Sequence, residues 1–188
     1  MGASLWYLSR ATGVASIVLL TVVVVLGVLV SGRRRPHGEN ATVVMAVHRW
    51  LSLGMVAFLA MHVLTAVVDS YVDVSALAVL VPFASSYETF WVGLGTLAVD
   101  ILVAVLLTSW WRHRLRERAW RVVHHATYLL WPIALVHGFV LGTTSEMWLL
   151  GTTVLSGAVG VAALLWRLLA RPHHDRARRD VVLEQEWT

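Results

Sequence analysis

The amino-acid sequence predicts an all-α integral membrane bundle of five transmembrane helices, with the N-terminus outside and the C-terminus in the cytoplasm. Three observations predict this fold class. The chain is 58% hydrophobic and only 14% charged, whereas charged residues make up about a quarter of a soluble domain. Five apolar runs are each near the roughly 20 residues that a helix needs to cross a bilayer. The arginines fall in alternate polar breaks between these runs.

Each apolar run is expected to form one membrane-spanning helix. The runs cover residues 11–30, 41–68, 90–111, 119–141 and 147–170. Only Arg10 is charged ahead of the first run, and no small-residue cleavage site follows it, so we expect a spanning helix and not a signal peptide. Residues 75–85 are apolar but too short to span, and they contain Pro82. This stretch predicts a short interfacial or re-entrant helix on the outer face, between the second and third spans.

The charged residues set the expected orientation. Arginines cluster after the first run, in residues 112–121 and in the tail from residue 171, while the other two breaks carry acidic residues and no arginine. Arginine-rich loops stay on the cytoplasmic side of a membrane. Residues 1–170 are therefore expected to be a single multi-pass domain in the plasma membrane, and residues 171–188 a charged cytoplasmic tail.

Composition also excludes several kinds of chemistry and partner. The sequence contains no cysteine, which excludes disulfides, iron–sulfur clusters and thiol chemistry. The net charge of +4 comes from arginines at the helix ends. Topology and contact with anionic lipid account for that charge, so we expect the bilayer as a partner and not nucleic acid.

Five of the nine histidines lie within the second and fourth runs: His48, His62, His124, His125 and His137. Ionisable groups at membrane depth are costly and usually face the bundle interior. His48 and His62 are 14 residues apart, which returns to nearly the same helix face after a rise of about 21 Å. A single buried histidine is often just hydrogen-bonded, but a matched set on two helices favours a binding role.

The second and fourth helices are separated by one helix, so they are expected to run parallel. His48 then lies at the height of His124, near the cytoplasmic side, and His62 at the height of His137, towards the outer side. Two imidazoles at one height can supply both axial ligands of a haem between the helices.

Periodicity alone does not place the histidines of the fourth helix on one face. The 13 residues from His124 to His137 turn the second ring roughly 140° from the first, and starting from His125 leaves roughly 120°. Pro132 lies between them, and a kink there could bring both rings to one face. His124 and His125 therefore both stay open as the ligand.

Arg10 and Asp100 are the other charged residues of interest. Arg10 is isolated at the outer end of the first helix, where it could pair with a propionate of the outer haem or extend to the headgroups. Asp100 lies near the middle of the third helix, where it could relay protons or tune a haem, or could be protonated and hydrogen-bonded. Trp50, Phe58 and Trp131 are expected to be packing residues. Four glycines are expected to permit close helix approach or to leave room beside a porphyrin: Gly13, Gly27, Gly54 and Gly95.

The fourth helix reads Trp120-Arg121-Val122-Val123-His124-His125-Ala126-Thr127-Tyr128, followed by His137-Gly138, and the first helix begins Arg10-Ala11-Thr12-Gly13. Together with the spacing of His48 and His62, this resembles the ferric reductase-like transmembrane domain. Ferric reductases, NADPH oxidases and the haem subunit of bacterial methionine sulfoxide reductase systems share that domain. The resemblance covers roughly residues 6–167.

The resemblance implies two b-type haems, the inner held by His48 and His124 and the outer by His62 and His137. It implies a transmembrane electron carrier from a cytoplasmic or membrane donor to an extracytoplasmic acceptor. Larger relatives carry a flavin and nicotinamide domain, whose glycine-rich fingerprint is absent from this sequence. The chain is therefore expected to be an oxidoreductase, or the haem subunit of one, that depends on a separate flavoprotein or other redox partner.

Two other functions remain open from the sequence. A proton or metal transporter could use the intramembrane histidines, because imidazole binds zinc, copper and nickel. Bound metal without porphyrin would favour that function. A structural anchor for a partner complex would carry the histidines incidentally, and alanine at His62 or His137 would then change nothing.

Overall fold

The computed structural model describes residues 2–31, 38–69, 74–142 and 146–169. Within these ranges the chain forms helices and turns without strands, which confirms the predicted all-α class. The helices are α1 (Gly2–Ser31), α2 (Glu39–Val68), α3 (Ala76–Leu80), α4 (Thr89–Trp110), η1 (Arg112–Arg114, a 3₁₀ turn), α5 (Glu117–His125), α6 (Thr127–Val140) and α7 (Met147–Leu169). The predicted tail, residues 171–188, lies outside the described residues.

Four of the described helices are long and apolar enough to cross a membrane: α1, α2, α4 and α7. They correspond to the first, second, third and fifth predicted spans. The fourth predicted span, residues 119–141, is instead divided into α5 with 9 residues and α6 with 14. Each part is shorter than the roughly 20 residues that a single crossing needs.

The division falls at Ala126, whereas the sequence suggested a possible kink at Pro132. Ala126 N–H donates to the carbonyl of Val123 (3.0 Å) in a tighter, 3₁₀-type turn. The hydroxyl of Thr127 donates to the carbonyl of His124 (2.8 Å), so a side chain satisfies a carbonyl at the end of α5. Pro132 lies inside α6, and the helix continues through it.

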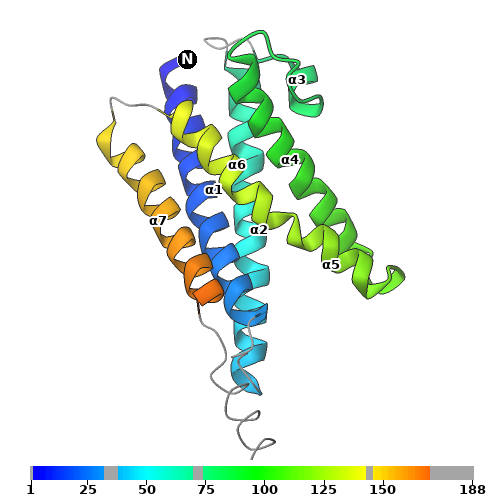
Figure 1. Ribbon diagram of the computed structural model, residues 1–188. Coiled ribbons are helices and arrows are strands. Elements are labelled where there is room, and N and C mark those ends of the chain that lie inside the picture. Colours follow the sequence, from blue (N-terminus) through cyan, green and yellow to red (C-terminus); the bar gives the residue numbers. More distant parts are fainter. Residues whose placement is uncertain (1, 32–37, 70–73, 143–145, 170–188) are drawn as a thin grey trace, which may run out of the picture.

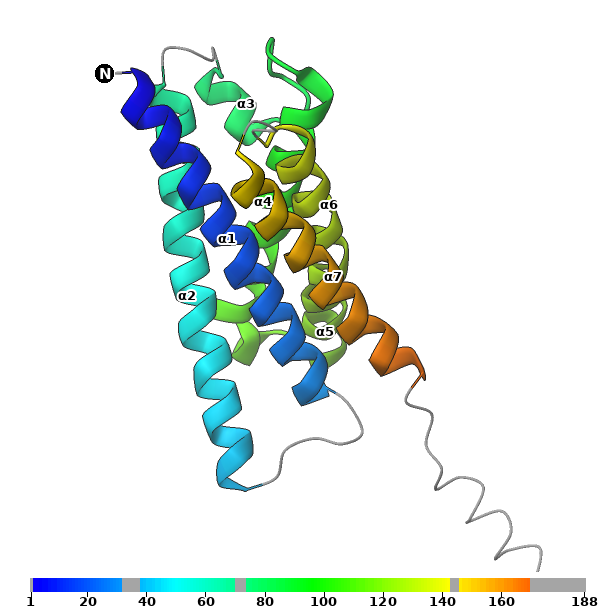
Figure 2. The same ribbon diagram turned by 90° about the vertical axis from the view of Figure 1, so that its left-hand side faces the viewer.

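α1 is the central helix of the bundle. It packs against α2, α6 and α7, while α4 packs against α3, α5 and α6. In Figure 1, α6 crosses in front of α1, and α4 lies on the opposite side of the bundle from α7. Figure 2 shows α1 and α2 side by side and antiparallel along most of their length.

The buried core lies at the middle height of the bundle, where α1, α2, α4 and α6 meet. Its members are Leu20, Val24, Met55, Ala98, Leu102, Leu130 and Trp131. The indole N–H of Trp131 donates to the hydroxyl of Thr21 (3.0 Å). The Trp131 ring also occupies the space that a side chain at Gly160 of α7 would need, so this residue joins three helices.

A helix forms within the apolar stretch 75–85, as α3. The hydroxyl of Thr96 on α4 donates to the carbonyl of Ala78 (2.6 Å), which fastens α3 to the end of the bundle where α1 begins. Phe83, in the following loop, adopts a left-handed φ of 65° and lies over Gly93. A larger residue at Gly93 would collide with this ring, which explains the glycine there.

Candidate functional site

Four histidines form two facing pairs in the bundle. The ring centroids of His48 on α2 and His124 on α5 are 6.5 Å apart. Those of His62 on α2 and His137 on α6 are 6.4 Å apart. We call His48 and His124 the inner pair, and His62 and His137 the outer pair.

The separation within each pair has a simple chemical meaning. Metal–imidazole bonds are about 2 Å long, so two rings bound to one metal ion have centroids roughly 6 Å apart. Both pairs have this spacing, at 6.5 Å and 6.4 Å. The ring planes are inclined by 54° in the inner pair and 80° in the outer pair. The spacing of each pair is therefore compatible with two imidazoles that bind one metal ion.

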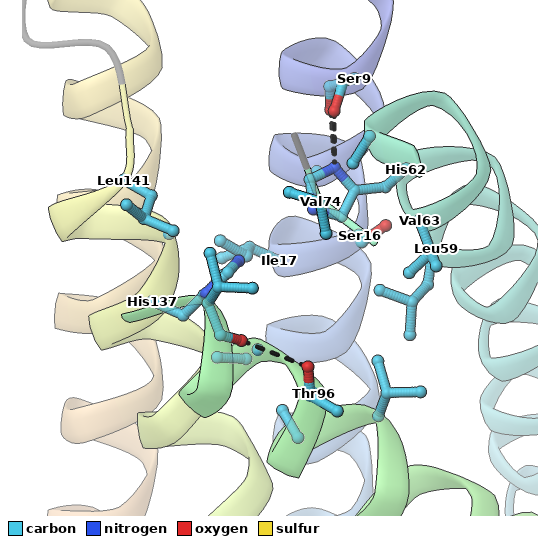
Figure 3. A pocket seen from close by; sticks show the side chains of 18 of the residues that line it. Ser9, Ser16, Ile17, Leu59, His62, Val63, Val74, Thr96, His137 and Leu141 are labelled. Atoms are coloured by element: carbon cyan, nitrogen blue, oxygen red, sulfur yellow. Dashed lines mark hydrogen bonds between the residues drawn. The ribbon is translucent and has the colours of Figure 1, made fainter. Parts of the chain in front are cut away.

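The outer pair is held by backbone carbonyls. Nδ1 of His62 donates to the carbonyl of Ser9 on α1 (2.8 Å), and Nδ1 of His137 donates to the carbonyl of Trp91 on α4 (2.8 Å). A carbonyl can only accept, so each Nδ1 carries the proton and each Nε2 keeps its lone pair. Figure 3 shows these two histidines reaching the cavity from opposite sides, with the Ser9 bond as a dashed line. This arrangement is typical of histidines that bind a metal through Nε2.

The inner pair has a different environment. Nδ1 of His48 and Nδ1 of His124 are both buried, and neither forms a hydrogen bond of normal geometry with the described residues, although the carbonyl of Val23 on α1 lies near His48. The indole of Trp120 stacks on His124, with centroids 4.9 Å apart and planes inclined by 22°. The guanidinium of Arg112 lies over the Trp120 ring, 4.2 Å from its centre. The inner pair is thus oriented mainly by ring packing.

A cavity between α1, α2, α4 and α6 contains both rings of the outer pair. Most of its wall consists of valine, leucine, alanine and glycine residues. Besides the two histidines, its polar members are Ser9, Arg10, Ser16, Asp69, Tyr87 and Thr96. An apolar enclosure with few polar groups and two facing imidazoles suits a large, mostly apolar cofactor.

Arg10 lies at the outer end of this cavity. Its guanidinium donates to the carbonyl of Leu141, the residue directly after α6. It also lies 5.3 Å from the ring centre of Trp6, in a cation–π contact. These contacts hold the charge at the cavity wall next to the outer pair, so it can reach an anionic group there.

His125 and Asp100 do not join these sites. His125 is exposed, its Nδ1 lies 2.5 Å from the carbonyl of Arg121, and its ring packs on Tyr128. It is therefore His124, and not His125, that faces His48. Asp100 is partly exposed on α4 and does not line the cavity.

The three aromatic residues that were expected to be packing residues differ in the exposed fraction of their side chains. Trp131 is 3% exposed in the core, while Trp50 is 72% and Phe58 44% exposed on the surface of α2.

The sequence did not reveal the roles of the Ser9 and Trp91 carbonyls, because no side chain marks a backbone acceptor. The Trp120 stack was also missed, although its spacing of four residues from His124 was a usable signal.

Among the described residues, each histidine pair offers a metal ion only two protein ligands, its two imidazoles. No group of three His, Cys, Asp or Glu side chains there is close enough to hold a metal ion. A bare metal ion in a protein usually has at least three protein ligands. The donor sets of the described residues therefore fit a porphyrin iron, which needs only two, better than a free metal ion.

Comparison with known proteins places the chain in a family. The model of the family described as "Ferric reductase like transmembrane component" matches residues 12–136, roughly two thirds of the chain. This segment contains three of the four paired histidines and ends one residue before His137.

A curated relative is the "Protein-methionine-sulfoxide reductase heme-binding subunit MsrQ" of Caulobacter vibrioides. It is 28% identical to this chain over 123 residues, which are 64% of this chain and 54% of the relative. The chain therefore spans about half the length of this relative. No solved structure matches.

Proposed function

We propose that this chain, which belongs to the ferric reductase like transmembrane component family, carries electrons across a membrane through two b-type haems. The inner pair binds one haem iron and the outer pair binds the other. The observation that carries the proposal is the spacing of the rings, 6.5 Å and 6.4 Å between centroids. The heme-binding function in the name of the Caulobacter relative supports it further.

The haems would supply the redox chemistry, and the residues of the chain hold, orient and enclose them. In the outer site the carbonyls of Ser9 and Trp91 hold Nδ1 of each ring, so that each Nε2 would be free to bind the iron. The apolar wall of the cavity excludes water. Arg10, beside the outer pair, is the group placed to bind a propionate, because guanidinium pairs well with carboxylate.

We propose five crossings of the membrane, with α5 and α6 together forming the fourth. Residues 117–140 rise by about 36 Å at 1.5 Å per residue, which is enough for a hydrocarbon core of about 30 Å. The arginine-rich segment 112–121 then lies in the cytoplasm beside the inner pair. The N-terminus and α3 lie on the outer side, α3 at the interface.

We propose a separate redox partner for this chain in the plasma membrane. The relative is named as a subunit of a reductase, which implies a complex of more than one protein. An electron would enter from a cytoplasmic or membrane donor, such as a flavoprotein, at the inner haem. It would leave from the outer haem to an acceptor outside.

A vesicle experiment tests this function. The purified chain is reconstituted with haem into sealed lipid vesicles that contain ferricyanide, and dithionite is added outside. The proposal predicts a reduced-minus-oxidised spectrum of bis-histidine b haem and reduction of the trapped ferricyanide. Colourless protein from haem-replete cells, or haem protein that transfers no electrons across the vesicle wall, would contradict it.

Replacing Arg10 by glutamine is expected to lower the midpoint potential of the outer haem. A positive charge near a haem favours the reduced iron, so its loss favours the oxidised form. A change of about 1.4 kcal/mol corresponds to roughly 60 mV for one electron. Potentiometric titration of both haems measures the effect, with Arg118→Gln in the first turn of α5, at the other end of the bundle, as the control. An unchanged outer potential would show that Arg10 does not contact the cofactor.

Replacing His125 by alanine is expected to leave both haems in place, because this ring faces away from His48. The adjacent substitution His124→Ala is expected to remove the inner haem. Haem content per protein, measured on the two variants side by side, checks this assignment. Haem loss in the His125 variant alone would exchange the roles of the two residues.

A further inference from the structure

Two glycines lie directly against the rings of the outer pair. A Cβ added at Gly95 of α4 would lie 2.5 Å from Cε1 of His137. A Cβ added at Gly13 of α1 would lie 3.0 Å from both Cε1 and Nδ1 of His62. Real Cβ atoms essentially never come closer than 3.0 Å to such atoms. The ring of His137 therefore occupies the space that a side chain at Gly95 would fill, and the ring of His62 would have to shift by a few tenths of an ångström to admit a side chain at Gly13.

The same glycines stand four residues after the carbonyls that hold these rings. Ser9 precedes Gly13 by four positions, and Trp91 precedes Gly95 by four. A helical Cβ points back towards the N-terminus, so the side chain at position i+4 covers the carbonyl at position i. A glycine at i+4 leaves that oxygen open to a second donor beside its helical N–H. Both outer histidines use an oxygen exposed in this way.

The inner pair supplies an internal comparison. Gly27 follows Val23 by four residues and faces His48, but a Cβ at Gly27 would be 3.8 Å from Cε1 of that ring, an ordinary contact. The ring lies further from the helix here. The carbonyl of Val23 lies near His48 but does not form a hydrogen bond of normal geometry with its Nδ1. Close packing on the glycine and a well-formed hydrogen bond to the carbonyl thus occur together in the outer pair, and both are looser at His48.

We propose that Gly13 and Gly95 are positioning residues for the outer haem. Each exposes one helix carbonyl, and this carbonyl fixes the Nδ1–H tautomer and the ring plane of the opposite histidine. The two carbonyls belong to different helices, α1 and α4, and they hold the two planes at 80°. The inference rests on the proposed function, because it assigns these histidines to a haem.

Spectroscopy can read the ring planes directly. Two nearly perpendicular axial imidazoles give a low-spin ferric haem a highly anisotropic electron paramagnetic resonance (EPR) signal with one large g value. Rings that rotate towards parallel lose this signal. A glycine with a purely structural role would not change the signal of a haem that remains bound.

The test compares four glycine-to-alanine variants of the whole chain purified with haem: Gly13→Ala, Gly95→Ala, Gly27→Ala and Gly54→Ala. Haem per protein, the EPR spectrum and the two midpoint potentials are measured for each. Gly54→Ala is the matched control, because its Cβ would be 4.0 Å from the nearest side-chain atom, on Leu19. The inner haem in the same sample reports that α2 and the α5–α6 pair are folded.

We expect one of two changes in the Gly13 and Gly95 variants. Either the outer haem is lost, so that haem per protein falls from two towards one, or the outer haem stays bound and its large-g EPR signal disappears. The inner haem should be retained in both, and the Gly27 and Gly54 variants should match the wild type. Unchanged outer signal and potential in Gly13→Ala and Gly95→Ala would overturn the inference. Loss of both haems together would also overturn it, because the effect is assigned to the outer site. Absence of haem from the wild type would instead refute the proposed function itself.

Discussion

Replacing His137 by alanine is expected to stop electron transfer across the membrane. The outer haem would lose one of its two axial ligands, and the remaining ring, His62, would face an empty space on the α6 side. In the vesicle assay, reduction of trapped ferricyanide should fall to the level of vesicles without protein. The inner haem should still be reduced by dithionite, because the inner pair is intact. The variant thus separates electron entry from electron exit.

The control for this prediction is His113→Ala, a change in the exposed 3₁₀ turn at the arginine-rich end. It should transfer electrons at the wild-type rate. Wild-type transfer by His137→Ala would contradict the proposed path through the outer site.

Replacing Trp131 by alanine is expected to cause the largest loss of stability. The side chain is 3% exposed, donates to Thr21 and fills the space beside Gly160. Large-to-small changes of a buried aromatic residue cost about 3–5 kcal/mol, because a cavity remains. The free energy of unfolding in detergent micelles, followed by circular dichroism, measures the effect.

Two companion variants show where this loss comes from. Trp131→Phe keeps most of the packing and removes the hydrogen bond, so about 1 kcal/mol is expected. Trp50→Ala removes a tryptophan that is 72% exposed, and a change within about 0.5 kcal/mol is expected. Equal destabilisation by Trp131→Ala and Trp50→Ala would show that Trp131 is not part of a packed core.

The helices and the heights of the histidines could be predicted from the sequence. Hydrophobic runs of the right length mark α1, α2, α4 and α7, because a continuous apolar run of about 20 residues satisfies its own backbone hydrogen bonds in lipid only as a helix. The 14-residue spacing of His48 and His62 follows helix periodicity, so one face of α2 carries both rings. The structure places these rings opposite His124 and His137.

The interruption between α5 and α6 could not be predicted in the same way. Pro132 was the visible helix breaker, yet the helix is interrupted at Ala126 and continues through Pro132. The interruption depends on a tight turn and on the hydroxyl of Thr127, which reaches the His124 carbonyl. Alanine and threonine are common inside helices, so neither residue marks a boundary by its type.

The hydrogen bonds of the outer pair were also hidden from the sequence. They join side chains to the carbonyls of Ser9 and Trp91, and every residue of a helix has such a carbonyl. The recognisable part is the glycine four residues later, but a glycine in a membrane helix has several other uses. Only the packing of α1 on α2 and of α4 on α6 shows which carbonyls the histidines meet.

The pairing of the histidines is the central claim, and haem counting in double variants tests it most directly. The wild type should contain two haems per chain. His62→Ala combined with His137→Ala removes both ligands of one site, so one haem should remain. His62→Ala combined with His124→Ala removes one ligand from each site, so no stably bound haem should remain. The same haem content in these two double variants would contradict the assigned pairs.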